Sequence, residues 1–413
     1  MKKFFSKNHQ IQEFDPKVTE TVKFKKENSA IESYYRLIIK IFLVIGFDFD
    51  GKYQKSRKVS FGLKLIKLIN MICIFLATFQ CLTYFFTENL SDVGTLGSGT
   101  FGLYSVQTIV KIFVYFAAID KFHQLTMDVI TTYRKFKPSE NDEKFFRTAY
   151  KVCPKIFFFN VFNLLFYSLT GLVRIGIATY MGTSVGSVFP YEAYWSFDPY
   201  EYLPWTLFYN AYTNVMTDFV SMICEQLFVF VVSHMVVSFE RLEDELVEII
   251  QQIDTVPSDV IKSKLPRCID LHNELIEHSK VVNSLFGISL LGFLIQSYWT
   301  ICYLIFLTTS KFSDFAILSA FALVNVSVQI LMLAYFAEKL KEKSLNLSDK
   351  LSSCSDKNID KSLAKYFILM IQVSNQPINL TASGFFKLDL PTFTTIVNTA
   401  YSYFAILRQA YKG

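Results

Sequence analysis

Residues Leu68–Phe86 read LINMICIFLATFQCLTYFF and contain no charged side chain. A helix that crosses the hydrocarbon core of a bilayer needs about 20 mostly apolar residues, because it must cover about 30 Å with a rise of about 1.5 Å per residue. This stretch therefore predicts a transmembrane helix. It also sets the criterion by which the rest of the chain can be divided.

The composition extends that prediction to the whole chain. Of its 413 residues, 52% are hydrophobic, 17% are aromatic and only 19% are charged, which is more apolar than an ordinary soluble domain. The net charge of +5 is small and its basic residues are scattered, so we expect no binding to nucleic acid. No segment stands apart in composition, and residues 1–413 are expected to form a single domain in the lipid bilayer.

Seven runs in all have the length and hydropathy of a span, which predicts an all-α membrane protein with seven transmembrane helices. Two other apolar stretches, Leu37–Phe47 and Tyr366–Phe386, are too short or too polar to span, and we interpret them as interfacial or protein-buried helices. The segment 338–386 is expected to form a cytoplasmic helical anchor region. The spans are expected at approximately residues 68–86, 96–119, 156–182, 205–239, 281–310, 315–337 and 390–407.

The lysines and arginines predict the orientation, because loops rich in these residues stay in the cytoplasm. They are distributed unevenly, with 15 in residues 1–67, eight in 120–155, five in 240–280, seven in 338–365, and none in 87–92 or 192–201. The N-terminus is therefore predicted to be cytoplasmic, and an odd number of spans places the C-terminus outside the cell. This orientation is opposite to that of G-protein-coupled receptors.

Enzymatic and metal-binding functions find no support in the sequence. It contains no G-x-S-x-G, no glycine-rich phosphate loop and no clustered histidines and acids, so we expect neither catalysis nor a cofactor nor a metal site. The seven cysteines have no spacing that indicates a disulfide framework. His272 and His278 are interpreted as solvated helix residues.

Four charged residues interrupt the predicted spans: Lys111, Arg174, Asp218 and Glu225. Ionisable groups inside a membrane are expensive and usually paired or functional. Lys111 and Asp218 are predicted to lie at similar depth, so a contact between them is possible. Asp218 and Glu225 are seven residues apart and share a helix face. A proton-coupled secondary transporter is the alternative, but it predicts inverted repeats with broken helices, which the sequence does not show.

The C-terminal segment carries a family resemblance. From Lys361 the chain reads KSLAKYFILMIQVSNQPINLTASGFFKLDLPTFTTIVNTAYSYFAILRQA, which resembles the closing pattern of insect odorant receptors, seven-helix ligand-gated cation channels with the same inverted topology. Cys268–His272 and Gln329–Leu340 are weaker similarities. Ser352-Ser353-Cys354 departs from the family, in which a Tyr-x-Cys followed by Trp is usual. The residues that carry the resemblance are Gln376–Pro377, Leu380–Ala382, Gly384–Phe385, Phe393 and Ser402–Leu407.

The resemblance implies a function and a partner. The segment 240–280 is much shorter than the corresponding loop of the shared co-receptor, so the chain resembles a ligand-selective subunit that assembles with the co-receptor as a tetramer. Such a subunit binds a small, volatile, hydrophobic odorant in the plasma membrane of olfactory sensory neuron dendrites. A gustatory receptor-type channel is the related alternative, because Tyr403–Gln409 keeps part of the closing pattern of that family.

In the resembling family the second, third, fourth and sixth spans enclose the ligand. An odorant site should be apolar and aromatic with few polar groups, although each such residue can equally serve ordinary helix packing. Gly171 stands out because a missing side chain makes room. The aromatic segment 189–205 is predicted to fold over the mouth of the pocket. The candidate ligand-binding residues are Tyr104, Thr108, Tyr167, Gly171, Tyr209, Tyr212, Thr213, Met216, Phe315 and Ser319.

The last span is predicted to line the pore. Asp389 can cap its N-terminus, and Thr392, Thr394, Thr395, Asn398, Thr399 and Ser402 supply a polar stripe. The alternative is that these hydroxyls only bond to their own helix backbone. By resemblance to the family's aliphatic closing ring, the gate falls on Ile406, with Gln409 and Ala410 about one turn further out. Ile406 facing lipid is the alternative.

We predict that an epitope tag at the C-terminus is accessible to antibody on intact cells, whereas a tag at the N-terminus is accessible only after permeabilisation. The reason is the one-sided distribution of lysine and arginine. A C-terminal tag that no antibody reaches on intact cells would require Tyr366–Phe386 to span the membrane, and it would contradict the seven-span topology.

Overall fold

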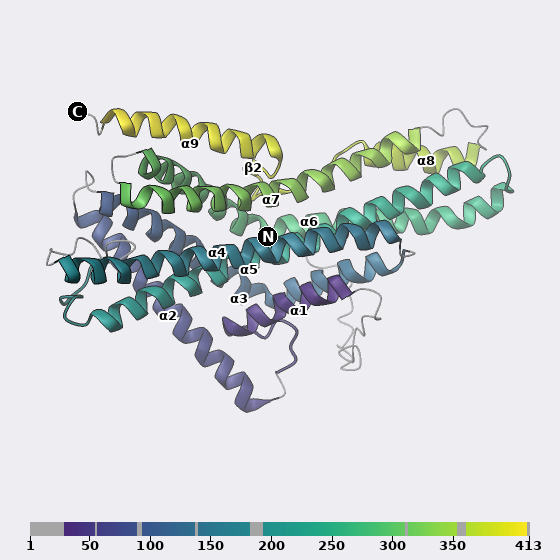
Figure 1. Cartoon of the computed structure of the whole chain (residues 1–413). Coiled ribbons are helices and arrows are strands. Elements are labelled where there is room, and N and C mark those ends of the chain that lie inside the picture. The colour runs from purple at the N-terminus through teal and green to yellow at the C-terminus, as the bar shows by residue number, and fades with distance from the viewer. Residues whose placement is uncertain are drawn as a thin grey trace, which may run out of the picture.

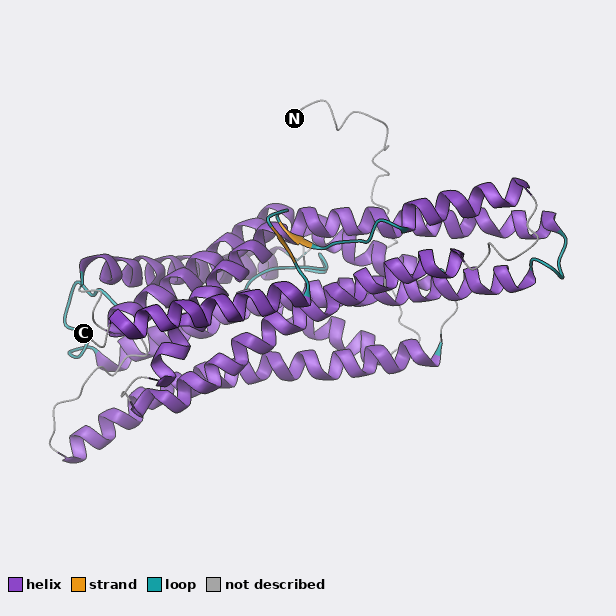
Figure 2. Ribbon diagram, turned by 90° about the horizontal axis from the view of Figure 1, so that it is seen from above, coloured by secondary structure: helices purple, strands orange, loops and turns teal. Residues whose placement is uncertain are grey.

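The computed structural model describes residues 29–53, 56–88, 93–136, 139–181, 193–309, 313–352 and 361–410. It is an elongated bundle in which the long helices lie side by side and α9 runs along one edge (Figure 1). The same arrangement is clear from above (Figure 2). The helices are α1 (Ser29–Val44), α2 (Arg57–Thr87), α3 (Val93–Arg134), α4 (Glu140–Met181), α5 (Leu203–Gln252), α6 (Ser258–Thr309), α7 (Ser313–Ser352), α8 (Lys361–Ser374) and α9 (Leu390–Ala410).

Five of the described helical segments are long and apolar enough to cross a membrane: Arg57–Thr87, Thr95–Arg134, Leu203–Gln252, Ser258–Leu307 and Ser319–Ser352. α4 and α9 cover the other two predicted spans. On α2, the side chains of Ile72, Phe75 and Phe79 are exposed on one face, as suits contact with lipid chains. The architecture is thus the predicted all-α, seven-helix fold.

The long helices extend well beyond the membrane thickness. α5 has 50 residues and α6 has 52, so each is about 75 Å long at about 1.5 Å per residue, against about 30 Å of hydrocarbon. The excess lies at the ends that carry the basic segments, where Arg241 of α5 contacts Asp142 of α4 at 2.5 Å. α3 to α7 therefore all continue past the predicted spans on the predicted cytoplasmic side. The sequence had indicated a helical extension there only for residues 338–386.

α5 is the centre of the bundle. Every residue from Val220 to Phe239 is buried, and the helix packs against α1, α2, α3, α4, α6 and α7. Apolar side chains lie on all sides of this stretch, and the neighbouring helices also enclose its polar side chains, such as Glu225 and His234. The position of α5 thus determines which faces of its neighbours point inward.

α1 covers the bundle as a protein-buried helix, as interpreted for Leu37–Phe47, although it begins earlier, at Ser29, and ends earlier, at Val44. Ile38 and Phe42 are buried. The Tyr34 ring stacks on Tyr150 of α4 with centroids 4.3 Å apart. The Tyr34 hydroxyl donates to Gln226 Oε1 of α5 at 2.6 Å. α1 therefore joins α4 to the central helix.

The predicted helix over Tyr366–Phe386 is wrong beyond Ser374, where α8 ends. Pro377 follows, and β1 (Thr381–Ala382) then pairs antiparallel with β2 (Phe386–Lys387). The turn between them needs positive φ, which is 53° at Ser383 and 78° at Gly384, and a helix cannot contain such residues.

The hairpin is fixed to α6 and positions the start of α9. Asn283 of α6 accepts a hydrogen bond from Thr381 N at 2.7 Å and donates one to Asn379 O at 3.0 Å. Asp389 Oδ1 accepts from Thr392 N at 2.9 Å, which is the predicted helix cap. The last helix therefore begins at a position set by α6.

The interpretation of His272 as a solvated residue is also wrong. Its side chain is buried, with the Phe239 ring of α5 at 6.2 Å and Ser374 Oγ of α8 at 3.5 Å. Packing of α8 onto α6 covers a face of α6 that the sequence pattern alone left open.

Candidate functional site

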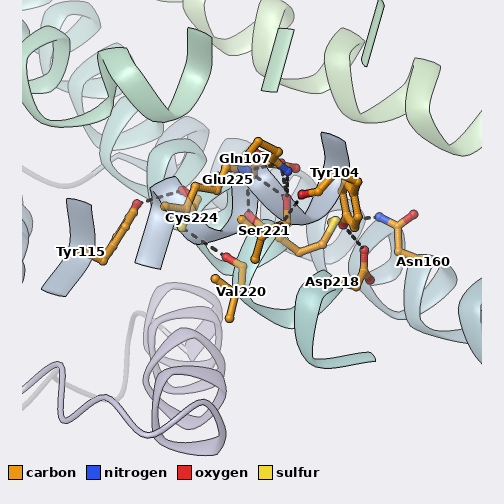
Figure 3. A network of polar contacts seen from close by, with 12 residues as sticks. Tyr104, Gln107, Tyr115, Asn160, Asp218, Val220, Ser221, Cys224 and Glu225 are labelled. Atoms are coloured by element: carbon orange, nitrogen blue, oxygen red, sulfur yellow. Dashed lines mark hydrogen bonds and ion pairs between the residues drawn. The ribbon is translucent and has the colours of Figure 1, made fainter. Parts of the chain in front are cut away.

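A network of polar side chains lies in the interior between α3 and α5 (Figure 3). Tyr104, Gln107 and Lys111 are spaced by three and four residues and so share one face of α3. Asp218, Ser221 and Glu225 share the facing side of α5 by the same spacing. We call these six residues the interhelical network.

Lys111 is the centre of this network. Its Nζ donates to Glu225 Oε1 at 3.1 Å, Ser221 Oγ at 2.9 Å and Ser221 O at 3.3 Å, which uses all three donors of an ammonium group. Lys111 is 1% exposed and Glu225 is 3% exposed. The Phe293 ring of α6 adds a cation–π contact at 5.2 Å. The pair is therefore a fully buried ion pair with a completed donor set.

The predicted contact of Lys111 with Asp218 is wrong, because Glu225 takes that place. Asp218 lies seven residues earlier on α5, about 10 Å along the helix axis. Its Oδ1 accepts instead from the Tyr104 hydroxyl at 2.8 Å. The depth of each charge depends on how α3 and α5 are shifted along one another, which the ends of the predicted spans do not reveal.

Within the described residues, this network places one cation beside two carboxyl groups. The second oxygens of Asp218 and Glu225 are buried, and neither has a hydrogen-bond partner among those residues. A buried acceptor without a partner costs free energy, and water or a ligand's donor group is its ordinary complement. The interhelical network is therefore suited to take up a polar group from a small molecule.

Sequence reasoning missed the neutral members of the site. Gln107 Nε2 donates to Ser221 Oγ at 3.0 Å, and Asn160 Nδ2 of α4 contacts Met222 Sδ at 2.8 Å. Gln107 and Ser221 each lie one helical turn before a charged residue, and that spacing was a signal that could have identified them.

The predicted ligand-binding residues that the structure describes do not form one group. Tyr104 faces the α5 carboxyl groups, and Ser319 is buried within α7. The Tyr209 hydroxyl donates instead to Gln80 Oε1 of α2 at 3.2 Å, and the Tyr212 hydroxyl donates to Asn70 of α2. Their hydroxyls are thus engaged in helix packing, and a role of either ring in ligand binding stays a prediction.

The remaining candidates are either bonded within their helix or not described. Thr108 and Thr213 donate to backbone carbonyls one turn earlier, and Met216 is half-buried against the core. The side chains of Tyr167, Gly171, Arg174, Phe315 and Ala410 lie outside the described residues.

The aromatic segment is described from residue 193 onward, and residues 189–192 lie outside the description. Tyr194 N donates to Gln80 O at 3.1 Å, and the Trp195 ring lies 5.9 Å from that of Tyr209. This segment therefore packs over the ends of α2 and α5.

α9 has one covered face and one uncovered face. Ala400 and Phe404 are buried where the helix packs on α6 and α7. Thr395, Asn398, Ser402 and Ile406 follow at intervals of three to four residues on the exposed side, and Ile406 is 62% exposed. The Thr395 and Ser402 hydroxyls donate to their own backbone, but the side chains stay uncovered. Of the predicted polar stripe, Thr394, Thr395, Asn398 and Ser402 are exposed on the free side of this edge helix, whereas Thr392 and Thr399 are half-buried.

The known proteins that this chain resembles in sequence are described as odorant receptors. A family model described as 7tm odorant receptor matches residues 95–401. Odorant receptor 67a of Drosophila melanogaster is 21% identical over 92% of this chain and 97% of its own length. The putative odorant receptor 85d of the same species is 30% identical over 36% of each chain.

Solved structures show the same fold. The insect olfactory receptor OR5 from Machilis hrabei, solved in complex with eugenol, superimposes with a TM-score of 0.73, 16% identity, and coverage of 92% of this chain and 99% of that one. A second structure of OR5 gives the same TM-score and identity.

We predict that Lys111→Met lowers the free energy of unfolding by about 3–5 kcal/mol, because the Glu225 carboxylate stays buried without its cation. The double variant Lys111→Met/Glu225→Gln should recover much of that loss. Thermal unfolding of the purified protein in detergent measures both, and Lys121→Met, at an exposed position of the same helix, is the control. A double variant no more stable than the single one would show that the loss does not arise from an unpaired Glu225 carboxylate.

Proposed function

Because this chain belongs to the 7tm odorant receptor family, a receptor family and not an enzyme family, we propose that it is the odorant-binding subunit of a ligand-gated, non-selective cation channel. The channel acts in the plasma membrane of insect olfactory neurons. It assembles with the co-receptor subunit as a tetramer, and a volatile hydrophobic molecule opens it.

The uncovered polar face of α9 is the observation that carries the channel proposal. Asn and Ser side chains that face hydrocarbon are unfavourable, yet Asn398 and Ser402 lie on the free side of a helix at the edge of the bundle. Four such helices around a common axis would turn these faces toward a shared water-filled path. Ile406, on the same face, then forms the aliphatic gate, with Gln409 and Ala410 beyond it.

The ligand site is proposed among α3, α4, α5 and α7, which are the second, third, fourth and sixth spans. The buried network with unpartnered carboxyl oxygens supports it, because a mainly apolar odorant can place one polar group there. The fold is shared with OR5, which was solved in complex with eugenol.

The alternatives have less support. The matching family model describes odorant receptors, so it does not favour a gustatory receptor-type channel. A secondary transporter would place its mid-membrane acids on a broken helix, whereas α5 is continuous through Asp218 and Glu225.

We predict that cells expressing this chain with the co-receptor give cation currents to members of a panel of volatiles, and that Gly171→Leu and Tyr209→Ala shift the potency of the active compounds. A change of about 1–3 kcal/mol in ligand binding corresponds to a roughly ten- to hundredfold shift in half-maximal concentration.

Two controls accompany these variants. Tyr209→Phe keeps the ring but removes the hydrogen bond to Gln80, and Phe208→Ala removes an exposed ring of the same helix. Unchanged dose–response curves for both site variants, with normal surface assembly, would place the ligand elsewhere. Co-expression that yields no response to any volatile in the panel would contradict the odorant function.

For the gate, we predict that Ile406→Ala raises the current without ligand, because a dry aliphatic ring blocks ions that cannot shed their water. Ile406→Lys should depress cation flux by repulsion in the narrow path. Ile396→Ala, on the side of α9 that packs against the core, is the matched control. If basal current, selectivity and block are all unaltered while surface expression is normal, Ile406 is not in the permeation path.

A further inference from the structure

A cavity of about 280 Å³ lies where α3, α6 and α9 meet, and it contains none of the residues of the proposed odorant site. Four of its lining side chains come from α6, one from α3 and one from α9. They are Leu96, Tyr298, Trp299, Cys302, Tyr303 and Tyr403.

We propose that this cavity is a second ligand site on the pore helix, for a neutral and mainly apolar molecule about the size of one substituted aromatic ring. It is independent of the interhelical network, and the molecule that fills it regulates how readily α9 moves.

The size and lining of the cavity support this ligand class. An apolar cavity of about 150 Å³ already binds benzene, and pockets for larger ligands begin at about 300 Å³. The lining is aromatic on several sides and, over the described residues, contains no charged side chain. Aromatic walls favour planar apolar molecules through stacked and edge-to-face contacts, whereas an ion would lack a compensating charge.

The walls of the cavity are well defined. The Tyr298 ring of α6 meets the Tyr403 ring of α9 edge to face, with centroids 5.7 Å apart and planes at 83°. A methyl group at Gly97 of α3 would lie 2.8 Å from the Tyr303 hydroxyl, so the glycine leaves the space that this ring occupies. Trp299 and Tyr403 are each at least 40% exposed, which leaves a route of entry from the surface.

The position of the cavity connects it to gating. Tyr403 lies one helical turn before Ile406 on the same helix. A molecule that contacts both Tyr403 of α9 and the side chains of α6 stabilises the conformation in which α6 and α9 enclose it. It therefore shifts the equilibrium between conformations of α9.

Cys302 permits a direct test, because its buried thiol lines the cavity. Benzyl methanethiosulfonate reacts with the thiolate, forming a mixed disulfide and releasing methanesulfinate. The full-length chain, purified with its co-receptor, is labelled in the presence and absence of toluene, and the extent of labelling at each cysteine is read by mass spectrometry. Toluene at ten times its Kd should slow labelling of Cys302 about tenfold.

Controls separate occupancy of the cavity from general effects. Cys73 of α2 is half-buried and outside the cavity, so toluene should leave its labelling rate unchanged. Benzenesulfonate carries a charge for which the described lining offers no compensating group, so it should not protect Cys302. If toluene does not slow labelling of Cys302, because a lipid chain or a neighbouring subunit fills the space, the proposal is overturned.

The proposed regulation of the channel through this cavity is tested by measuring cation currents. Benzylation of Cys302 should change the half-maximal odorant concentration, or the basal current, by about fivefold or more, and a reducing agent should reverse the change. Cys302→Ser should abolish it. A fully labelled Cys302 with unchanged currents would disprove regulation through this site. Protection by toluene is read without any odorant response, so failure of the proposed odorant function and failure of this proposal give different results.

Discussion

The complete burial of the middle of α5 is the constraint on which the bundle depends. From Val220 to Phe239 this helix has no side exposed to lipid or water, so other helices must surround it completely. In a bilayer each helix already satisfies its own backbone hydrogen bonds, and what remains to be decided is which side chains face which neighbour. α5 decides this for α1, α3, α4, α6 and α7 together, because each of them packs a face against it.

That burial also explains where the polar groups of the interior lie. Asp218, Ser221 and Glu225 sit on α5 at its packed surface, and the only way to accommodate them there is to supply partners from the facing helix. Lys111 and Tyr104 of α3 do so. One oxygen on each carboxyl group still lacks a hydrogen-bond partner among the described residues, and the proposed ligand site rests on this feature.

α9 is the opposite case. It is held at its start by the Asp389 cap and by the hairpin on α6, but only one of its faces is covered. The uncovered face carries the polar stripe and Ile406, and the cavity beside Tyr403 lies where α9 meets α3 and α6. This helix is thus held at its start and covered on one face only.

The sequence by itself determined the long helices and their order, but not the β1–β2 hairpin that follows α8. Runs such as Leu68–Phe86 are long enough to span as helices, and a helix satisfies the backbone of a single segment in hydrocarbon. The polar stripe and cap of the last helix follow from local spacing. Only the tertiary structure decided that Lys111 pairs with Glu225 and not with Asp218, that Tyr209 turns toward α2, and that His272 is buried. Each of these depends on the rotation and axial shift of one packed helix against another. Hydropathy indicates that a residue lies within a membrane helix. Which residue of another helix it contacts depends on how side chains from distant segments pack together.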